Sequence, residues 1–188
     1  MKYSFSITVY DLFKDPIFIA FKKIKKRING HVFSSILKLA LDIAIFGREG
    51  KKIGTAFIIG DVKNVLIHSH QMIINPYRYQ NKKDKEIFRK ENWESIKNFA
   101  QLDGVFIVSK DGEIICAGRY LDVDKKKLKV EKGLGSRHIS AASITIETSA
   151  IAIIISESGG TIRIYMDGKE IFLIDPYTIS LIINKKIY

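Results

Sequence analysis

The sequence predicts an α/β fold: a mixed β-sheet flanked by helices on both faces, with an N-terminal helical segment. Helical and strand periodicities alternate in the first part of the chain, which favours parallel strand pairs. Strands joined by short glycine-containing turns follow in the later part, and such hairpins pair antiparallel strands. Hydrophobic residues make up 46% of the 188 residues, enough to bury a core between these layers.

The N-terminal part is predicted to be mainly helical. Residues 1–12 alternate weakly between polar and apolar side chains and predict a short strand. Apolar and basic residues then recur at helical spacing from Ile17 to Ile28, and Asn29-Gly30 is typical of a helix end. Ser34 or Ser35 is expected to cap a second helix, which has a broad apolar face.

The middle of the chain supplies the first strands of the sheet. Residues 52–60 read as a buried strand, whereas residues 62–74 are ambiguous between helix and strand. A helix is predicted over residues 84–101, where apolar residues recur on one side. Residues 105–108 and 114–120 then predict two strands, since Asp-Gly between them is a hairpin turn signal.

The last third continues with one helix and three strands. A basic loop is expected over residues 122–132, followed by a helix from about Arg137 to Thr148. Residues 150–156 are apolar and predict a buried strand. Strands near residues 161–166 and 170–174 complete the predicted sheet.

Composition limits the class of protein. The net charge is +11, but the lysine and arginine clusters are scattered along the chain and are not interleaved with aromatic residues, so no nucleic-acid partner is expected. The longest apolar run, residues 36–46, falls short of the roughly 18 residues that a membrane span needs. No signal-peptide pattern is present, and the single cysteine excludes an intrachain disulfide. We therefore expect a cytoplasmic protein with no membrane partner.

The segment Gly133-Leu134-Gly135-Ser136-Arg137-His138 is typical of a turn that binds phosphate. A flexible glycine turn leaves backbone N–H groups free at the start of a helix, and Ser136, Arg137 and His138 add side-chain donors. A cation in the first turn of a helix opposes the helix dipole, so this arrangement costs stability unless an anion binds. The alternative, in which Ser136 is a plain N-cap beside ordinary first-turn residues, stays open at this point.

Two further segments carry acidic residues at strand ends. Asp103-Gly104 joins a predicted helix to a strand, which places a carboxylate at a strand mouth, where ligands bind open α/β sheets. Ser156-Glu157-Ser158-Gly159-Gly160 ends a buried strand, and its glycines would let a phosphate approach the backbone. Each segment has a structural alternative, because Asp-Gly and Gly-Gly pairs also form simple turns.

His68-Ser69-His70 superficially resembles a pair of metal ligands on a strand. Alternate strand positions share one face, but no third histidine or cysteine lies at a useful spacing. Ordinary surface or core histidines are the favoured interpretation.

Taken together and in this order, the three motifs resemble those of the diadenylate cyclases, which join two ATP molecules into cyclic di-AMP and release two pyrophosphates. The family motifs Asp-Gly-Ala, Gly-Thr-Arg-His-Arg and a Ser-Glu strand end before Gly-Gly correspond here to Asp103-Gly104-Val105, to Gly135-Ser136-Arg137-His138-Ile139 and to residues 156–160. The similarity covers roughly residues 50–175, and Ala117-Gly118-Arg119-Tyr120-Leu121 looks like the stretch that packs on adenine in the family. Within this family, the sequence resembles a soluble archaeal-type branch more than the membrane-bound bacterial members.

The chain departs from the family pattern at three positions. Val105 replaces the alanine of the first motif. Ile139 replaces the second arginine of Arg-His-Arg in the second motif, which removes one cation from the expected phosphate site. Leu102 stands where membrane-bound members often have a metal-binding histidine. Ile139 and Leu102 favour an alternative function, a nucleotide- or nucleic-acid-binding module that does not turn its ligand over.

The resemblance implies a domain division, a mechanism and a set of site residues. Residues 1–50 would form the helical segment and residues 51–188 the cyclase domain. The enzyme would use Mn²⁺ or Mg²⁺, and two protomers would face each other as a homo-oligomer, each holding one ATP. The implied catalytic residues are Asp103, Gly104, Arg137 and His138; the implied nucleotide-binding residues are Gly104, Tyr120, Leu121, Gly135, Ser136, Arg137, His138, Ser156 and Glu157; the implied metal ligands are Asp103 and Glu157.

Overall fold

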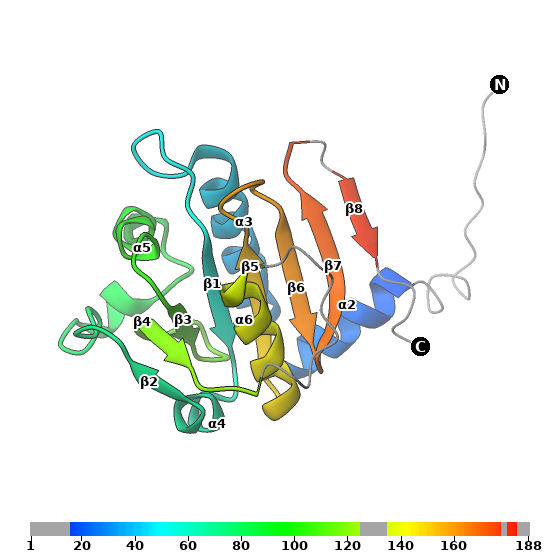
Figure 1. Ribbon diagram of the computed structural model, residues 1–188, viewed down its shortest axis with the longest axis horizontal. Coiled ribbons are helices and arrows are strands. Elements are labelled where there is room, and N and C mark those ends of the chain that lie inside the picture. Colours follow the sequence, from blue (N-terminus) through cyan, green and yellow to red (C-terminus); the bar gives the residue numbers. More distant parts are fainter. Residues whose placement is uncertain (1–15, 125–134, 178–179, 184–188) are drawn as a thin grey trace.

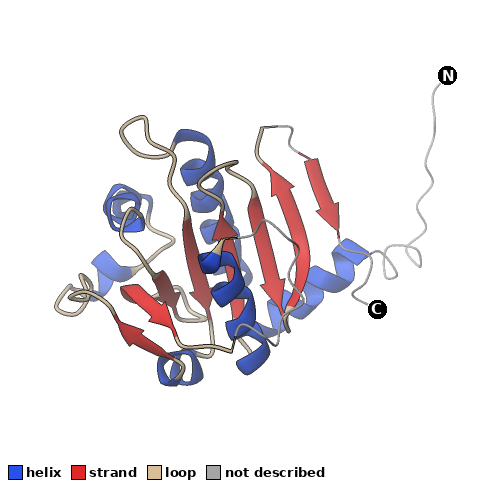
Figure 2. Ribbon diagram, viewed as in Figure 1, coloured by secondary structure: helices blue, strands red, loops and turns tan. Residues whose placement is uncertain are grey.

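The computed structural model describes residues 16–124, 135–177 and 180–183, which form a sheet with helices on both faces (Figures 1 and 2). The helices are α2 (Pro16–Arg27), α3 (Gly30–Phe46), α4 (Val62–Ile67), α5 (Trp93–Ala100) and α6 (Ser136–Glu147), with short 3₁₀ turns at Lys82–Lys85 and Lys90–Asn92. The strands are β1 (Thr55–Ile59), β2 (Ser69–Gln71), β3 (Val105–Val108), β4 (Ile114–Leu121), β5 (Ile151–Ile155), β6 (Ile162–Met166), β7 (Lys169–Asp175) and β8 (Ser180–Ile183).

The eight described strands form one mixed sheet in the order β2-β4-β3-β1-β5-β6-β7-β8. β1 and β3 are parallel, and every other neighbouring pair is antiparallel. The two central strands, β1 and β5, are buried at every position. The predicted mixed sheet is confirmed.

The two faces of β1 belong to two different apolar clusters. Phe57 and Ile59 face α2, α3 and α5, whereas Ala56 and Ile58 face α4 and α6. This follows from the strand period of two residues, which sends neighbouring side chains to opposite faces. Helices therefore cover both faces of the sheet, as predicted, and α6 lies across the face opposite α3 (Figure 1).

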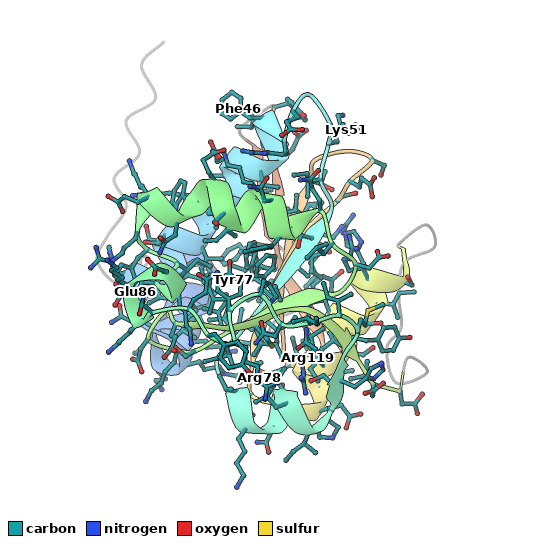
Figure 3. The ribbon with its side chains drawn as sticks, turned by 90° about the vertical axis from the view of Figure 1, so that its left-hand side faces the viewer. Phe46, Lys51, Tyr77, Arg78, Glu86 and Arg119 are labelled. Carbon is teal, nitrogen blue, oxygen red and sulfur yellow. The ribbon has the colours of Figure 1, made fainter. Side chains whose placement is uncertain are left out.

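The N-terminal helices share a core with the sheet. Residues of α2 and α3, among them Ile24, Ile36 and Ile43, are fully buried in the same apolar cluster as Phe57 and Phe172. Tyr77 also lies in this interior (Figure 3), and burial raises the pKa of its phenol. The division at residue 50 stays a prediction.

Two helix boundaries differ from those predicted. The second helix begins at Gly30 rather than near Ser34, because the Asn29 side chain accepts a hydrogen bond from the His31 N–H at 2.8 Å and caps it. The helix predicted over residues 84–101 is confined to α5. The Asn92 side chain donates to the Lys83 and Glu86 carbonyls, and such side-chain-to-backbone bonds compete with a continuous helix.

The ambiguous residues 62–74 divide into α4 and β2, and the sequence pattern did not predict β8. The strand predicted over residues 1–12 and most of the basic loop predicted over 122–132 lie outside the described residues. Among the described helices, none is by itself long and apolar enough to span a bilayer; α2 and α3 reach that length only together, and a bend of 107° separates them.

Candidate functional site

One pocket of about 1010 Å³ brings together every residue that the sequence assigned to the site. It opens where α6 begins, beside the amino ends of the parallel strands β1 and β3 and the carboxyl ends of β4 and β5. Asp103 lies at the predicted junction just before β3, so this pocket is at the amino ends of the parallel strands, whereas ligands of open α/β sheets usually bind at the carboxyl ends. The predicted residues that line the pocket are Asp103, Gly104, Tyr120, Leu121, Gly135, Ser136, Arg137, His138, Ser156 and Glu157.

Gly104 sets the position of Asp103 at the pocket. Its φ is +98°, and a Cβ there would lie 2.6 Å from the backbone nitrogen of Arg119 on β4. Only glycine fits this close approach of two strands, at the point where the β3–β4 register is irregular. The turn leaves the Asp103 side chain 87% exposed to the solvent that fills the pocket.

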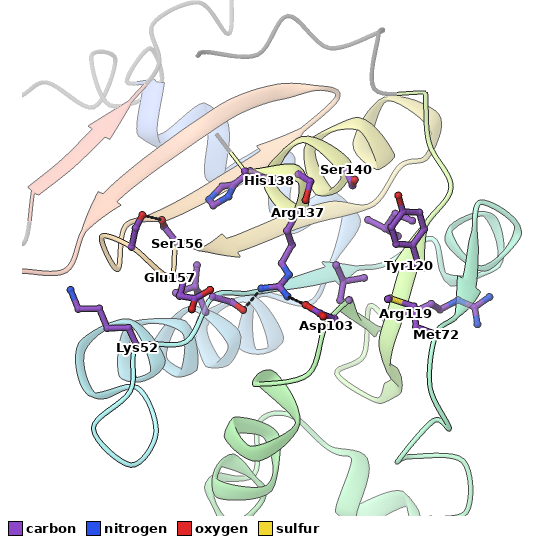
Figure 4. Close-up of a pocket in the computed structure, with 18 of the residues that line it drawn as sticks. Lys52, Met72, Asp103, Arg119, Tyr120, Arg137, His138, Ser140, Ser156 and Glu157 are labelled. Atoms are coloured by element: carbon purple, nitrogen blue, oxygen red, sulfur yellow. Dashed lines mark hydrogen bonds and ion pairs between the residues drawn. The ribbon is translucent and has the colours of Figure 1, made fainter. Parts of the chain in front are cut away.

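Arg137 joins three segments that are far apart in the sequence (Figure 4). Its guanidinium donates to an oxygen of Asp103 at 3.1 Å and to the Gly54 carbonyl just before β1. The start of α6, the start of β3 and the start of β1 therefore meet at one side chain. Because the arginine fork carries further donors, an anion can bind to the same group.

The N-terminus of α6 has the features of an anion site. Gly135 precedes the helix with φ −67° and ψ 163°, no side chain caps the first turn, and that turn holds no acidic residue. A Cβ at Gly135 would meet no atom within 4 Å, so the described protein does not require glycine there. The open side of Gly135 and the exposed Ser136 leave the positive end of the helix dipole facing the pocket.

His138 is the neutral member of the motif. Burial, with the nearby charges of Arg163 and Arg137, lowers its pKa to about 4. Its Nε2 atom is buried and has no hydrogen-bond partner among the described residues. His138 therefore adds a neutral hydrogen-bonding group rather than a second charge beside Arg137.

The other end of the pocket is largely apolar. Met72 and Tyr120 line it (Figure 4) together with Leu121, and the Tyr120 ring packs on the His70 imidazole with centroids 5.2 Å apart. Beside them, Arg119 is held by bonds of 2.7 Å to the Ser69 hydroxyl and 2.8 Å to its carbonyl. An apolar surface that includes an aromatic ring suits a planar heterocycle.

The histidines near this end do not form a metal site. His68 contacts the Asn64 carbonyl at 2.9 Å through Nδ1, and His70 contacts Asp122 at 2.8 Å. In the part of the chain that the structure describes, no three metal-ligating side chains cluster anywhere. The favoured interpretation of His68-Ser69-His70 is thus consistent with the geometry.

The two glycines of the third motif do not line the pocket, and Gly160 has a packing role instead. Ser156, Glu157 and Ser158 line the pocket, whereas Gly159 and Gly160 do not. Gly160 has φ +67°, which favours glycine, and it lies against the Ala44 carbonyl and the Tyr177 ring. Its lack of a side chain therefore serves packing within the protein rather than the approach of a phosphate.

Several lining residues were missed because their motifs carry no signal of their own. They come from the loop before β1, from the segment after β2, from β5 and from α6. Only the Lys-Lys pair directly before a buried strand could have been noticed. The positions concerned are Lys51, Lys52, Gly54, Met72, Ser140 and Ile155, whereas Val105, Arg119 and Ser158 stand in the quoted motif segments and also line the pocket. Leu102 and Ile139, two of the departures from the family pattern, are not part of the pocket lining.

Comparison with known proteins supports the resemblance stated above. A family model described as DisA bacterial checkpoint controller nucleotide-binding matches residues 42–170. The chain is 39% identical over 171 residues to the diadenylate cyclase of Methanocaldococcus jannaschii, covering 91% of this chain and 51% of the relative. It is 33% identical over 170 residues to that of Haloferax volcanii, with coverages of 89% and 58%. The chain thus spans about half the length of the curated relatives it matches.

Solved structures share the fold. A cysteine double mutant of DacA from Staphylococcus aureus has a TM-score of 0.53 at 23% identity, covering 74% of this chain and 83% of that one. A hypothetical membrane spanning protein from Bacillus cereus has a TM-score of 0.60 at 15% identity, with coverages of 82% and 68%. Because the family model spans more than half of the sequence, and the motifs that carry the resemblance line one pocket, the chain belongs to the DAC family, the nucleotide-binding family of the DisA checkpoint controller.

Proposed function

We propose that the chain is a diadenylate cyclase that condenses two ATP molecules into cyclic di-AMP and releases two pyrophosphates. The observation that carries this proposal is the 3.1 Å contact between Arg137 and Asp103, which joins the open N-terminus of α6 to an exposed carboxylate. A phosphate-binding group and a group able to take a proton thus lie side by side in a pocket of ligand size. The names of the two archaeal relatives support the same activity.

The pocket's two ends suggest how ATP lies in it. The adenine would pack at the apolar end, against Tyr120 and Leu121. The phosphates would extend toward the start of α6, where Ser136, Arg137 and the free N–H groups meet the anion. Between these ends the ribose would lie next to Asp103.

Asp103 would act on the ribose 3′-hydroxyl. The 3′-oxygen forms a bond to the α-phosphorus of the second nucleotide, and the bond from that phosphorus to the bridging β-oxygen breaks. The carboxylate orients the hydroxyl and accepts its proton, while pyrophosphate departs with the electron pair. Arg137 and the helix N-terminus stabilise the charge that grows on the α-phosphate during the transfer.

A divalent cation fits the acidic residues present. Asp103 and Glu157 both line the pocket and offer the oxygen ligands that Mg²⁺ and Mn²⁺ prefer. Such ions commonly take one or two protein carboxylates and complete their shell with water and substrate phosphates, so the lack of a three-residue cluster among the described residues is compatible with this. The ion would supply positive charge to the phosphates.

Two protomers would be needed for one product. Each pocket would hold one ATP, and each 3′-hydroxyl must reach the other nucleotide's α-phosphorus, so the pockets must face each other across a two-fold axis. We expect the specific activity to fall on dilution as the assembly dissociates. A specific activity that stays constant down to concentrations at which sedimentation shows only monomer would contradict the paired arrangement.

Product analysis tests the activity itself. Mass spectrometry after incubation with ATP and Mg²⁺ or Mn²⁺ should detect cyclic di-AMP and two pyrophosphates per product. Asp103→Asn should lower the rate by about a hundredfold or more, the typical contribution of a positioned base. Asp111→Asn, at an exposed turn outside the pocket, should retain activity. Tight ATP binding without any product would instead support a nucleotide-binding module that does not turn over.

A further inference from the structure

We propose that Lys52, held in place by Tyr177, binds the β- and γ-phosphates of the substrate and the pyrophosphate that leaves. This inference rests on the proposed ATP site and assigns residues to its far end. Neither position belongs to the three motifs, and Tyr177 reaches the site only through the fold.

Lys52 lies at the end of the pocket opposite Tyr120 (Figure 4). It lines the pocket on the same side as Ser156 and Glu157 (Figure 4), with Lys51 beside it in the sequence. Both lysines are exposed, and the described residues provide neither with a carboxylate partner. Arg137, by contrast, already shares its charge with Asp103. Unpaired ammonium groups therefore lie beyond the α-phosphate position, where two more phosphates need them.

Tyr177 holds the Lys52 side chain at this position. The ammonium nitrogen of Lys52 lies 5.8 Å from the centre of the Tyr177 ring, within cation–π range. The Tyr177 hydroxyl donates to the Ala44 carbonyl at 3.3 Å, near the end of α3. A Cβ at Gly160 would lie 3.2 Å from the ring, so the glycine of the third motif makes room for it. Gly160 thus bears on the site through Tyr177 and Lys52.

The loop before Lys52 is also fixed. Gly47, Glu49 and Gly50 all have positive φ, and a Cβ at Gly47 would lie 2.0 Å from the Lys51 carbonyl oxygen. Arg48 bonds through its backbone to Lys51 and through its side chain to Glu94 of α5. Lys51 and Phe46 accordingly lie at the same end of the molecule (Figure 3). A fixed loop presents its lysines with less loss of freedom on binding.

The placement matches the charge that the reaction releases. When the bond between the α-phosphorus and the bridging oxygen breaks, the β-phosphate oxygen takes the electron pair and gains negative charge. An ammonium group beside that oxygen stabilises the leaving group, as positioned cations do in phosphoryl transfer. Lys52 would bind ATP and pyrophosphate but contribute little to AMP, which lacks these phosphates.

Calorimetric titration of ATP, pyrophosphate and AMP into Lys52→Ala tests the assignment. The affinity for ATP and for pyrophosphate should fall by about tenfold to a hundredfold, the usual effect of losing a charged hydrogen bond, while that for AMP changes less than about twofold. Lys169→Ala, at an exposed strand position outside the pocket, is the matched control and should leave all three unchanged. Equal losses for AMP and ATP, or no loss for ATP, would overturn the proposal.

Tyr177 has its own pair of variants. Tyr177→Phe keeps the ring and should retain the preference for ATP over AMP, whereas Tyr177→Leu should lose part of it, with a higher Kd for ATP in the same calorimetric titration. Equal behaviour of the two variants would show that the ring does not position Lys52. These are binding readouts, so they stand even if wild-type protein binds ATP and makes no cyclic di-AMP; that result would contradict the proposed function alone. Failure of the wild-type protein to bind ATP would contradict both.

Discussion

Helices α3 and α6 lie on opposite faces of the sheet, and their N-termini are built differently. α3 begins behind Asn29, whose side chain accepts the His31 N–H at 2.8 Å. α6 begins behind Gly135, with no side-chain cap. Neither has an acidic residue in its first turn, so the two helix starts differ in the cap and in Arg137, a cation that only α6 carries there. The free N–H groups at the start of a helix need hydrogen-bond acceptors. In α3 the Asn29 side chain is such an acceptor, whereas the N–H groups at the start of α6 face the pocket.

We infer that the first turn of α6 lowers the stability of the folded protein and in return allows an anion to bind there. Arg137 and His138 follow Gly135, and a cation at this helix end opposes the dipole. The protein meets part of that cost with the Asp103 ion pair and part by keeping His138 neutral. A bound triphosphate would supply the rest. The comparison can therefore be tested by adding a cap to α6, by removing the Arg137 cation from its first turn, and by removing the Asn29 cap from α3.

The largest effect is expected from giving α6 a cap. Gly135→Asp fits the backbone, since φ is −67° and the space around a Cβ is open. The carboxylate should cap α6 and, because glycine is already a tolerable N-cap residue, stabilise the fold by only about 0.3 kcal/mol, raising the Tm by about 1 °C. The same carboxylate should weaken ATP binding by about a hundredfold or more, because it repels the phosphates and occupies their donors. Differential scanning calorimetry and ATP titration measure both; unchanged ATP affinity with a raised Tm would break the comparison.

Removing the cation at the α6 start is expected to have a somewhat smaller effect. Arg137→Ala should weaken ATP binding by about tenfold to a hundredfold, the range for losing a charged phosphate contact. Arg78→Ala, which removes an exposed arginine outside the pocket, should leave the affinity unchanged. Equal ATP affinities for the two variants would place the phosphates away from α6.

Removing the cap of α3 should affect stability only. Asn29→Ala is expected to lower the free energy of unfolding by about 1 kcal/mol and the Tm by about 2–4 °C. Its ATP affinity should equal that of the wild type, because Asn29 lies outside the pocket. Denaturant unfolding and ATP titration provide the two values. A loss of ATP affinity would show that the two helix starts are not independent.

The last prediction concerns the pH dependence of stability, which does not involve ATP. The folded pKa of His138, about 4, lies below the ordinary value of 6.5, so the unfolded chain binds more protons between these values. His138 should therefore lower the free energy of unfolding as the pH falls from about 6.5 toward 4. The difference in unfolding free energy between wild type and His138→Gln should shrink or reverse from pH 7 to pH 5. A difference independent of pH would contradict a neutral buried His138.

The parts of the site that the sequence predicts are those that depend on local chain order. The α6 turn and Asp103-Gly104 each lie within a few residues of a strand or helix end, where glycine and capping signals act, whereas Tyr120 and Leu121 are implied by the family resemblance alone. The position of Lys52 and the contacts of the Arg119 side chain could not be predicted from local chain order. Lys52 depends on Tyr177, which is 125 residues later, and Arg119 depends on Ser69 and Leu66. Such contacts exist only once the sheet has formed.

The helix starts show the same limit. Asn29-Gly30 was interpreted as a helix end, and α2 does end just before it, at Arg27. The same asparagine caps the next helix, because only two residues separate the two helices. Asparagine is common both at helix ends and at N-caps, so its local signal does not say which helix it serves. β8, an edge strand that pairs only with β7, likewise lacked a distinct local pattern.

A crystal structure of Asp103→Asn with ATP and Mg²⁺ tests most directly whether the open end of α6 and residue 103 meet around one nucleotide. We predict that the phosphates lie on the first turn of α6 and contact Arg137, that the ribose 3′-hydroxyl faces residue 103, and that the adenine packs on Tyr120. ATP bound with its phosphates away from α6, or bound outside this pocket, would contradict the account.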